Sequence, residues 1–285
     1  MKPLLFLLTV LAGTTILTAC NSNDSATTTS ETTTDTTVNQ TATNAITEQP
    51  VSYASGNTTM NGYFAYDSAS TAKKPIVLVV HEWWGLTDYP RMRARQLAQL
   101  GYLAMAVDMY GNGKVAANPE EAQNMATPFY QNPQEAQARL EAALAQARQH
   151  PHADTSKTAA IGYCFGGTMV LNAAKLGSDF DGVVSFHGGL EGVTPQKGKT
   201  KAQMLVLHGG ADSFVPQAQV DAFRKSLDSV GASYSFKVYD SATHAFTNPD
   251  ADKNAKQFGM PIKYNGAADT ASWNDMKAFL QQVFQ

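Results

Sequence analysis

The sequence predicts an α/β fold with a mostly parallel central sheet and helices on both of its faces. From about residue 75 onward, short apolar, β-branched runs alternate with longer segments whose apolar residues have helical spacing. The run 75–80, PIVLVV, is apolar throughout, which is typical of a strand buried on both faces of a parallel sheet. We therefore expect right-handed crossovers between successive strands and a ligand site at the carboxyl ends of the strands.

The folded region is predicted to open with a hairpin over residues 51–66, because β-prone residues flank the turn signal Gly56-Asn57. Later strands are predicted from apolar runs, and helices from apolar residues three or four positions apart. The predicted strands are 75–80, 103–107, 158–163, 182–186, 204–207 and 234–239. The predicted helices are 88–100, 120–126, 133–149, 166–176, 216–230 and 268–283.

Residues 1–20 have the pattern of a cleaved export signal. Lys2 precedes an apolar run over residues 4–17 that is too short for a bilayer-spanning helix. The segment ends in Leu17-Thr18-Ala19-Cys20, which resembles the lipobox of bacterial lipoproteins, whose cysteine is lipidated and becomes the mature N-terminus. We expect an exported protein, anchored through lipid on Cys20 to a bacterial membrane on its periplasmic or cell-surface side. The alternatives are a plain secretory signal and an apolar N-terminal helix.

Residues 21–50 are rich in Thr, Ser, Asn and Ala and contain no Lys or Arg, so we expect a disordered tether. Residues 51–285 then form one domain. The chain has 24 acidic and 21 basic residues, and removing the four tether acids and Lys2 leaves 20 of each. A neutral domain has no electrostatic reason to bind nucleic acid or a polyanionic surface. We expect a monomer.

The segment 160–167, AIGYCFGG, has the spacing of the nucleophile elbow G-x-S-x-G, with Cys164 in place of the serine. Gly162 and Gly166 stand where a sharp strand-to-helix turn leaves no room for side chains. The N-terminus of the following helix would favour a thiolate and a developing oxyanion. In isolation, the motif fits equally well a strand that packs tightly against a helix.

Two later strand ends supply an acid and a base for Cys164. The strand 204–207 leads through a glycine turn to Asp212, and the strand 234–239 leads to His244. The order of nucleophile, acid and base is the one found in the α/β-hydrolase fold. In this arrangement Cys164 attacks a carbonyl carbon, His244 moves the proton, and Asp212 orients the imidazole.

Other side chains compete for these roles. His187 and His208 also follow strands, but a strand-end histidine beside a glycine turn is more often structural, and neither follows the predicted acid in the chain. Asp240 is the main rival to Asp212, although it lies on the same strand exit as His244. We favour Asp212 and His244.

The segment after the strand 75–80 is expected to complete an oxyanion hole. Trp83 would donate one backbone N–H and Phe165 the other. Glu82 lies among aromatic residues, where a carboxylate is costly unless it is paired. At least one of Trp83 and Trp84 is also expected to serve in packing.

Residues 51–285 resemble the dienelactone hydrolase family within the α/β-hydrolase fold. The resemblance rests on five motifs in the family's order. They are Glu82-Trp83-Trp84-Gly85, Asp108-Met109-Tyr110-Gly111, Gly162-Tyr163-Cys164-Phe165-Gly166-Gly167, Gly209-Gly210-Ala211-Asp212 with Val215-Pro216, and His244-Ala245-Phe246.

The resemblance implies a Cys164-His244-Asp212 triad that cleaves an ester or lactone through a thioester acyl-enzyme. It also implies that Glu82 contacts the thiol and takes its proton when substrate displaces the carboxylate. A thiol that stays neutral until substrate arrives would resist oxidation in an exported protein.

The family's substrate pocket is expected at Trp84, Tyr110, Asn112 and Asn248. Family members that cleave dienelactone hold its carboxylate with two arginines, at the places where this chain has Asn112 and Asn248. Asparagine cannot form charge-assisted bidentate pairs with a carboxylate. We therefore expect a neutral or differently shaped ester or lactone instead of dienelactone.

Two other functions stay open on the same fold. They are a binding lipoprotein without catalytic activity, and an acyltransferase or another thiol-dependent enzyme. The sequence has no metal-ligand spacing such as H-E-x-x-H and no glycine-rich nucleotide loop, so we expect neither a metal nor a cofactor.

Overall fold

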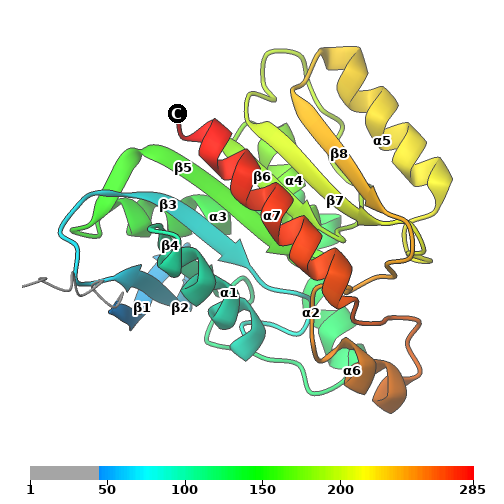
Figure 1. Ribbon diagram of the computed structural model, residues 1–285, viewed down its shortest axis with the longest axis horizontal. Coiled ribbons are helices and arrows are strands. Elements are labelled where there is room, and N and C mark those ends of the chain that lie inside the picture. The colour runs from blue at the N-terminus through cyan, green and yellow to red at the C-terminus, as the bar shows by residue number, and fades with distance from the viewer. Residues whose placement is uncertain (1–44) are drawn as a thin grey trace, which may run out of the picture. The chain divides into compact units, whose positions relative to one another are not determined.

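The computed structural model describes residues 45–285, which form one eight-stranded sheet flanked by helices (Figure 1). The strands are β1 Ile46–Ser55, β2 Thr58–Asp67, β3 Lys74–Val80, β4 Leu103–Val107, β5 Ala153–Tyr163, β6 Gly182–Phe186, β7 Gln203–Gly209 and β8 Tyr234–Tyr239. The helices are α1 Asp88–Gln99, α2 Pro119–Gln131, α3 Pro133–Arg148, α4 Phe165–Leu176, α5 Gln217–Val230, α6 Ala251–Phe258 and α7 Gly266–Val283. In this part of the chain, every helix is too short or too polar to cross a bilayer.

The strand order is β1-β2-β4-β3-β5-β6-β7-β8, with the hairpin at one edge and β8 at the other. The hairpin strands pair antiparallel, as do β2 and β4, and all other neighbours are parallel. Val80 lies opposite both Val107 and Gly162, and Tyr163 lies opposite Phe186. The loops that follow the parallel strands therefore leave the sheet along a common edge, as the alternation of strands and helices predicts.

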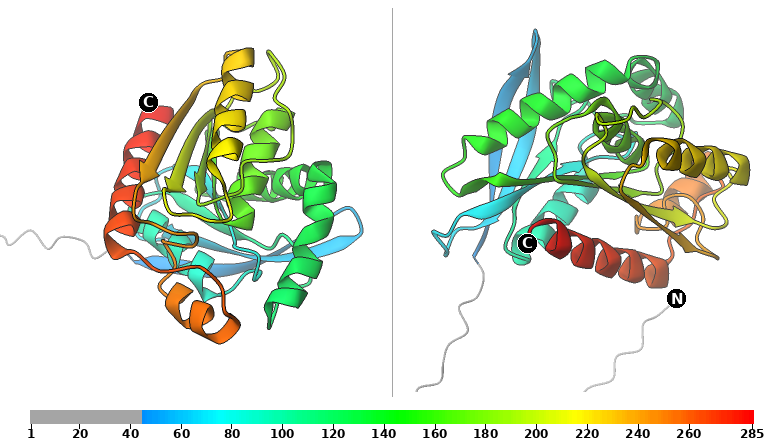
Figure 2. Two further views of the ribbon diagram at one scale, coloured as in Figure 1. Left: turned by 90° about the vertical axis from the view of Figure 1, so that its right-hand side faces the viewer. Right: turned by 90° about the horizontal axis from the view of Figure 1, so that it is seen from above.

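Helices cover both faces of the sheet (Figure 2). One apolar core joins the sheet to α3, α4 and α5, with Leu140 and Met169 fully buried. The other joins it to α1 and α7, with Leu97 and Leu280 fully buried. The β-branched residues of β3 serve both cores, since consecutive side chains in a strand point to opposite faces. The predicted α/β-hydrolase fold is thus confirmed.

The folded domain begins earlier than residue 51, the boundary drawn from composition. Strand β1 starts at Ile46, and Glu48 within it forms ion pairs with Arg91 at 3.1 Å and Arg95 at 2.8 Å. This strand lies at the sheet edge, where its side chains face solvent. Its sequence is therefore polar and was not distinguished from the Thr-rich segment before it. The predicted signal peptide, Cys20 and most of the predicted tether lie outside the described residues.

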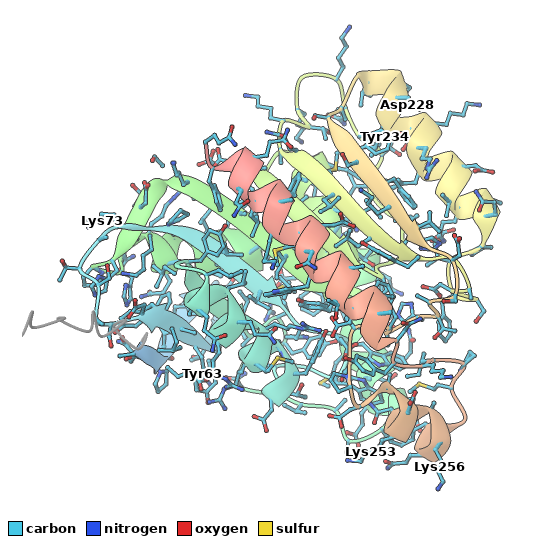
Figure 3. The ribbon with its side chains drawn as sticks, in the orientation of Figure 1. Tyr63, Lys73, Asp228, Tyr234, Lys253 and Lys256 are labelled. Atoms are coloured by element: carbon cyan, nitrogen blue, oxygen red, sulfur yellow. The ribbon has the colours of Figure 1, made fainter. Side chains whose placement is uncertain are left out.

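One helix, α6, is absent from the sequence prediction. Its apolar residues Ala251, Ala255 and Phe258 do have helical spacing, but the helix is only eight residues long, which is too short for that pattern to predict it. Lys253 and Lys256 are exposed and point away from the domain (Figure 3). Helix α2 is also longer than predicted, because Pro128 lies inside it and does not end it.

Candidate active site

Cys164 lies in the sharp turn between β5 and α4, with backbone angles φ 52° and ψ −114° that are strained for a residue with a side chain. The flanking glycines make the turn possible. A Cβ on Gly162 would lie 2.2 Å from the carbonyl carbon of Gly166, and a Cβ on Gly166 would lie 2.5 Å from the Val80 oxygen. The turn therefore has the close backbone packing that a nucleophile elbow requires.

The structure brings together the three side chains that sequence reasoning grouped at the strand ends. His244 Nε2 lies 3.1 Å from Cys164 Sγ, and His244 Nδ1 lies 2.8 Å from Asp212 Oδ2. The Asp212 side chain is fully buried, and its other oxygen accepts the Phe214 backbone N–H at 2.9 Å. Because Asp212 is fixed in this way, it holds the imidazole with its second nitrogen directed at the sulfur.

The rival side chains occupy other places. The backbone N–H of Cys164 is shared between the Phe186 carbonyl at 3.0 Å and His187 Nδ1 at 3.2 Å, and the His187 ring has no hydrogen bond with the thiol. His208 is not on the wall of the pocket that contains Cys164. Asp240 is exposed, while Asp212 holds His244 Nδ1.

The electrostatics at His244 favour the imidazolium. Burial alone would lower its pKa, but the negative charge of Cys164 and the hydrogen bonds to Asp212 and Cys164 outweigh that effect and raise the pKa well above its ordinary value. A protonated imidazole next to sulfur stabilises a thiolate. The pair is therefore suited to nucleophilic chemistry.

Glu82 is buried, and Asn248 Nδ2 donates a hydrogen bond to its Oε2 at 2.5 Å. Burial raises the pKa of Glu82 to about 7, although the Asn248 hydrogen bond and the charge of His244 oppose the shift. The family resemblance implies a contact between this carboxylate and the thiol. The structure instead pairs it with Asn248, while Glu82 and Cys164 line the same pocket.

That pocket has a volume of about 580 Å³ and opens over Cys164 and His244. Its apolar wall includes Trp83, Trp84, Phe214, Met260 and Ile262. Its polar wall includes Gln123, Asn172 and Gln219, and its carboxylates are Glu82 and Glu191. Among the described residues that line it, there is no Lys or Arg. Residues 45–285 contain no group of three or more His, Cys, Asp or Glu placed to hold a metal ion.

Only Trp84 of the four predicted pocket residues lies on this wall. Tyr110 is buried behind it and donates a hydrogen bond to the Trp83 carbonyl at 2.8 Å. Asn112 is exposed in a left-handed turn with φ 56° and is not among the residues that line the pocket. Asn248 acts from behind Glu82, which is a supporting position and not the predicted contact with substrate.

Of the predicted oxyanion donors, Phe165 directly follows Cys164 in the chain, and Trp83 lines the same pocket as Cys164. Phe165 is the first residue of α4, so its N–H has no acceptor within the helix. The next amide, that of Gly166, is already bonded to the His81 carbonyl at 3.1 Å. The hydrogen bond from Tyr110 to the Trp83 carbonyl fixes the segment that would supply the second N–H.

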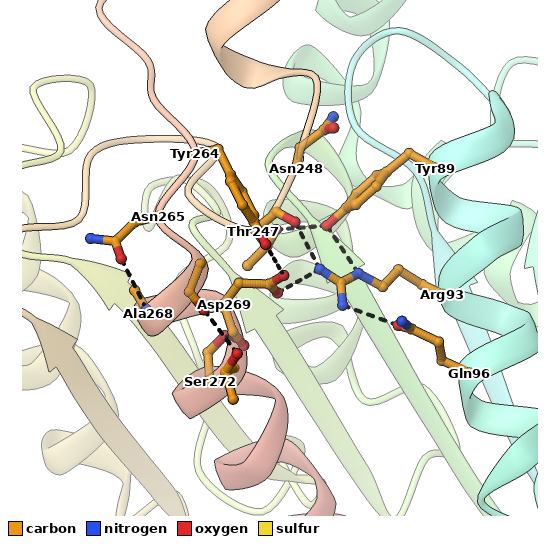
Figure 4. Close-up of polar contacts among 12 residues, drawn as sticks. Tyr89, Arg93, Gln96, Thr247, Asn248, Tyr264, Asn265, Ala268, Asp269 and Ser272 are labelled. Atoms are coloured by element: carbon orange, nitrogen blue, oxygen red, sulfur yellow. Dashed lines mark hydrogen bonds and ion pairs between the residues drawn. The ribbon is translucent and has the colours of Figure 1, made fainter.

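A buried polar network lies behind the site (Figure 4). Thr247 Oγ1 lies 2.7 Å from His187 Nε2 and 2.6 Å from the Tyr89 hydroxyl. Arg93 donates to the Thr247 carbonyl at 2.7 Å and to Asp269 at 2.5 Å. The network joins α1, the residue after β6, α7 and the loop after His244. No local sequence pattern predicts it.

The raised pKa of Glu82 predicts that the stability of the domain depends on pH. Because its folded-state pKa of about 7 exceeds the ordinary 4.5, the unfolded chain loses this proton first, and stability falls as pH rises from about 4.5 to 7. Glu82→Gln keeps an acceptor for Asn248 and removes this loss. We therefore compare the change in the free energy of unfolding that Glu82→Gln causes at pH 8 with the change that it causes at pH 4.5. We expect the change at pH 8 to be more favourable by up to about 3 kcal/mol. Urea denaturation at both pH values checks this, with the exposed Glu120→Gln as the control. Equal effects of Glu82→Gln at the two pH values would contradict it.

Comparison with known proteins gives the same fold and a family. The model of the dienelactone hydrolase family matches residues 60–284. A protein of Methylorubrum extorquens, provisionally named carboxymethylenebutenolidase, is 30% identical over 183 residues, which cover 60% of this chain and 63% of that relative, just under two thirds of its length.

Solved structures agree with this result. A dienelactone hydrolase-like promiscuous phosphotriesterase from metagenomic libraries has a TM-score of 0.79 and 31% identity, covering 84% of this chain and 99% of that one. A provisionally named dienelactone hydrolase from Klebsiella pneumoniae has a TM-score of 0.71 and 26% identity, covering 84% and 100%. With the family match extending over most of the folded domain, the chain belongs to the dienelactone hydrolase family.

Proposed function

We propose that this protein hydrolyses carboxylic esters or lactones, with Cys164 as the nucleophile and a thioester acyl-enzyme as the intermediate. The observation that carries the proposal is the continuous contact from Cys164 Sγ through His244 to the buried Asp212, at 3.1 and 2.8 Å, in the wall of a pocket. Family membership supports the same class of reaction.

In the proposed reaction, the Cys164 sulfur attacks the carbonyl carbon and the carbonyl electrons move onto oxygen. The backbone N–H groups of Trp83 and Phe165 stabilise that oxyanion. The C–O bond to the alcohol then breaks, and the alcohol leaves with the proton held by His244. Water attacks the thioester, gives its proton to His244, and releases the acid and Cys164. Asp212 keeps the imidazole oriented throughout.

The pocket favours an uncharged substrate. Its walls carry two carboxylates and, within the described residues, no Lys or Arg that would pair with a carboxylate on the substrate. The His244 imidazolium also lines the pocket, but it is already paired with Asp212 and Cys164. Asn248 is hydrogen-bonded to Glu82, and Asn112 is not among the residues that line the pocket, so neither replaces an arginine. We therefore propose neutral esters or lactones with an apolar group that contacts Trp83 and Trp84.

A panel of neutral p-nitrophenyl esters and lactones, assayed with wild type and Cys164→Ala, tests the proposal. We expect hydrolysis by wild type and a loss of at least about 1000-fold in the variant. Intact-mass spectrometry after rapid acid quenching should show an acyl adduct that maps to Cys164. Binding without Cys164-dependent release would favour the non-catalytic alternative. Transfer of the acyl group to an added alcohol in preference to water would favour the acyltransferase.

We also propose that the domain is exported and held at a bacterial membrane by lipid on Cys20. The lipobox-like ending of residues 17–20 supports this. Expression in a bacterial host should place the wild type in the membrane fraction and Cys20→Ala in the soluble fraction. Co-fractionation of Cys20→Ala with the membrane would rule out lipid on Cys20 as the anchor.

A further inference from the structure

Lys175 is a buried cation that the proposed reaction does not use. It lies in the last turn of α4, and only 3% of its surface is exposed. Its Nζ lies 4.9 Å from the centroid of the Phe223 ring. Within residues 45–285, the ammonium has neither a hydrogen bond nor an ion pair, so the face of an aromatic ring is its main electrostatic contact.

A buried charge without a partner is unfavourable, because the protein interior solvates it poorly. Burial lowers the pKa of Lys175 to about 8, and no neighbouring carboxylate contributes to the shift. The side chain therefore stays largely protonated near neutral pH. The Nζ is not among the fully buried, unpaired polar atoms of the described residues, so the ammonium keeps an opening to solvent through which a ligand can reach it.

The Lys175 side chain lines a second pocket, of about 520 Å³, between α4, the segment 190–195 and α5. Much of the remaining wall is apolar, as at Leu190, Val193, Pro216 and Phe223. A volume in this range is typical of small-molecule sites. The pocket thus combines hydrocarbon walls with one unpaired ammonium.

This second pocket adjoins the pocket of Cys164. Glu191, Gly192 and Gln219 line both. Glu191 is exposed and forms no ion pair with Lys175 in the described chain, so it leaves the ammonium free and places a negative charge at the boundary between the two pockets. A ligand carboxylate is therefore favoured beside Lys175 over the pocket of Cys164, which carries both Glu82 and Glu191.

We propose that the second pocket is a binding site for an organic carboxylate with an apolar chain, whose carboxylate pairs with Lys175. One ammonium on a flexible stem suits a singly charged group, whereas phosphate sites usually gather several donors. The apolar walls contact the hydrocarbon part of the ligand. The acid released by ester hydrolysis has this chemistry, but binding here does not require Cys164.

The test measures octanoate and its neutral isostere octanamide by titration calorimetry at pH 7, with Cys164→Ala as the parent protein. We expect octanoate to bind at least about tenfold more tightly than octanamide. Adding Lys175→Met should abolish that preference, and Lys175→Arg should largely keep it. Ala222→Trp, which fills the second pocket from an exposed position, should weaken octanoate binding without touching the ammonium.

Two results would overturn the proposal: equal affinities for octanoate and octanamide, or an unchanged octanoate affinity in Lys175→Met. With Cys164 intact, Lys175→Met should hydrolyse p-nitrophenyl acetate within about twofold of wild type, because that substrate is too short to reach the second pocket. Since octanoate binding is measured without the nucleophile, failure of the carboxylate site and failure of the proposed hydrolysis are separate results.

Discussion

Replacing His244 with glutamine is expected to lower kcat/KM for a cleaved ester by about 1000-fold or more. His244 Nε2 lies 3.1 Å from Cys164 Sγ, and its raised pKa depends on the sulfur and on Asp212. Glutamine can hydrogen-bond to sulfur but cannot carry a proton at neutral pH, so both the thiolate and the protonation of the leaving group lose their support. Steady-state kinetics with the best ester of the panel measures the loss.

His208→Gln is the matched control. His208 also follows a strand in a parallel sheet, and sequence reasoning weighed it as a base, but it is not on the wall of the pocket over Cys164. We expect its kcat/KM to stay within about threefold of wild type. Activity in His244→Gln above about a tenth of wild type, or an equal loss in His208→Gln, would contradict the assignment of the base.

Burial explains how much of the fold could be predicted. The strands 103–107, 182–186 and 234–239 were predicted with the bounds that the structure has, because Gly or polar residues bracket their β-prone runs. The start of β5 was missed, since residues 153–157 are mostly polar although they continue the strand. Helix α6 was missed for a different reason, since its eight residues are too few to establish an apolar period.

The candidate site was predictable to the extent that it follows strand ends. Cys164, Asp212 and His244 each come after a strand of one parallel sheet, so fold and chain order suffice to bring them together. Which way a loop side chain points is a different matter. Asn112 was assigned to the pocket through family correspondence, but a left-handed turn carries it to the surface.

Thr247→Val is expected to lower kcat about 10- to 100-fold and leave KM within about threefold, because the hydroxyl positions the site without contacting substrate. Thr247 Oγ1 fixes His187, whose Nδ1 accepts the backbone N–H of the strained Cys164. The next residue, Asn248, holds Glu82. Valine keeps the shape and removes both hydrogen bonds of the hydroxyl, so the elbow loses a constraint on its unfavourable backbone angles.

The loss of buried hydrogen bonds should also lower the free energy of unfolding by about 1–3 kcal/mol, and the two effects have to be separated. Thr158→Val serves this purpose, since Thr158 is also buried and its hydroxyl donates to the Asp179 carbonyl at 3.1 Å, in the middle of β5 and away from the turn that holds Cys164. Thr158→Val should lose stability and keep kcat, whereas Thr247→Ser should recover most of both.

The rate of Cys164 alkylation by iodoacetamide gives a readout that stability alone would not move. In Thr247→Val alkylation at pH 7 should be slower, because a displaced elbow weakens the contact between sulfur and His244 that supports the nucleophile. If the alkylation rate and kcat of Thr247→Val are unchanged, and its stability loss equals that of Thr158→Val, the network contributes to packing and does not position the nucleophile. Slower alkylation in Thr247→Val alone would show that the Thr247 hydroxyl, through His187, helps to hold the nucleophile in its strained position.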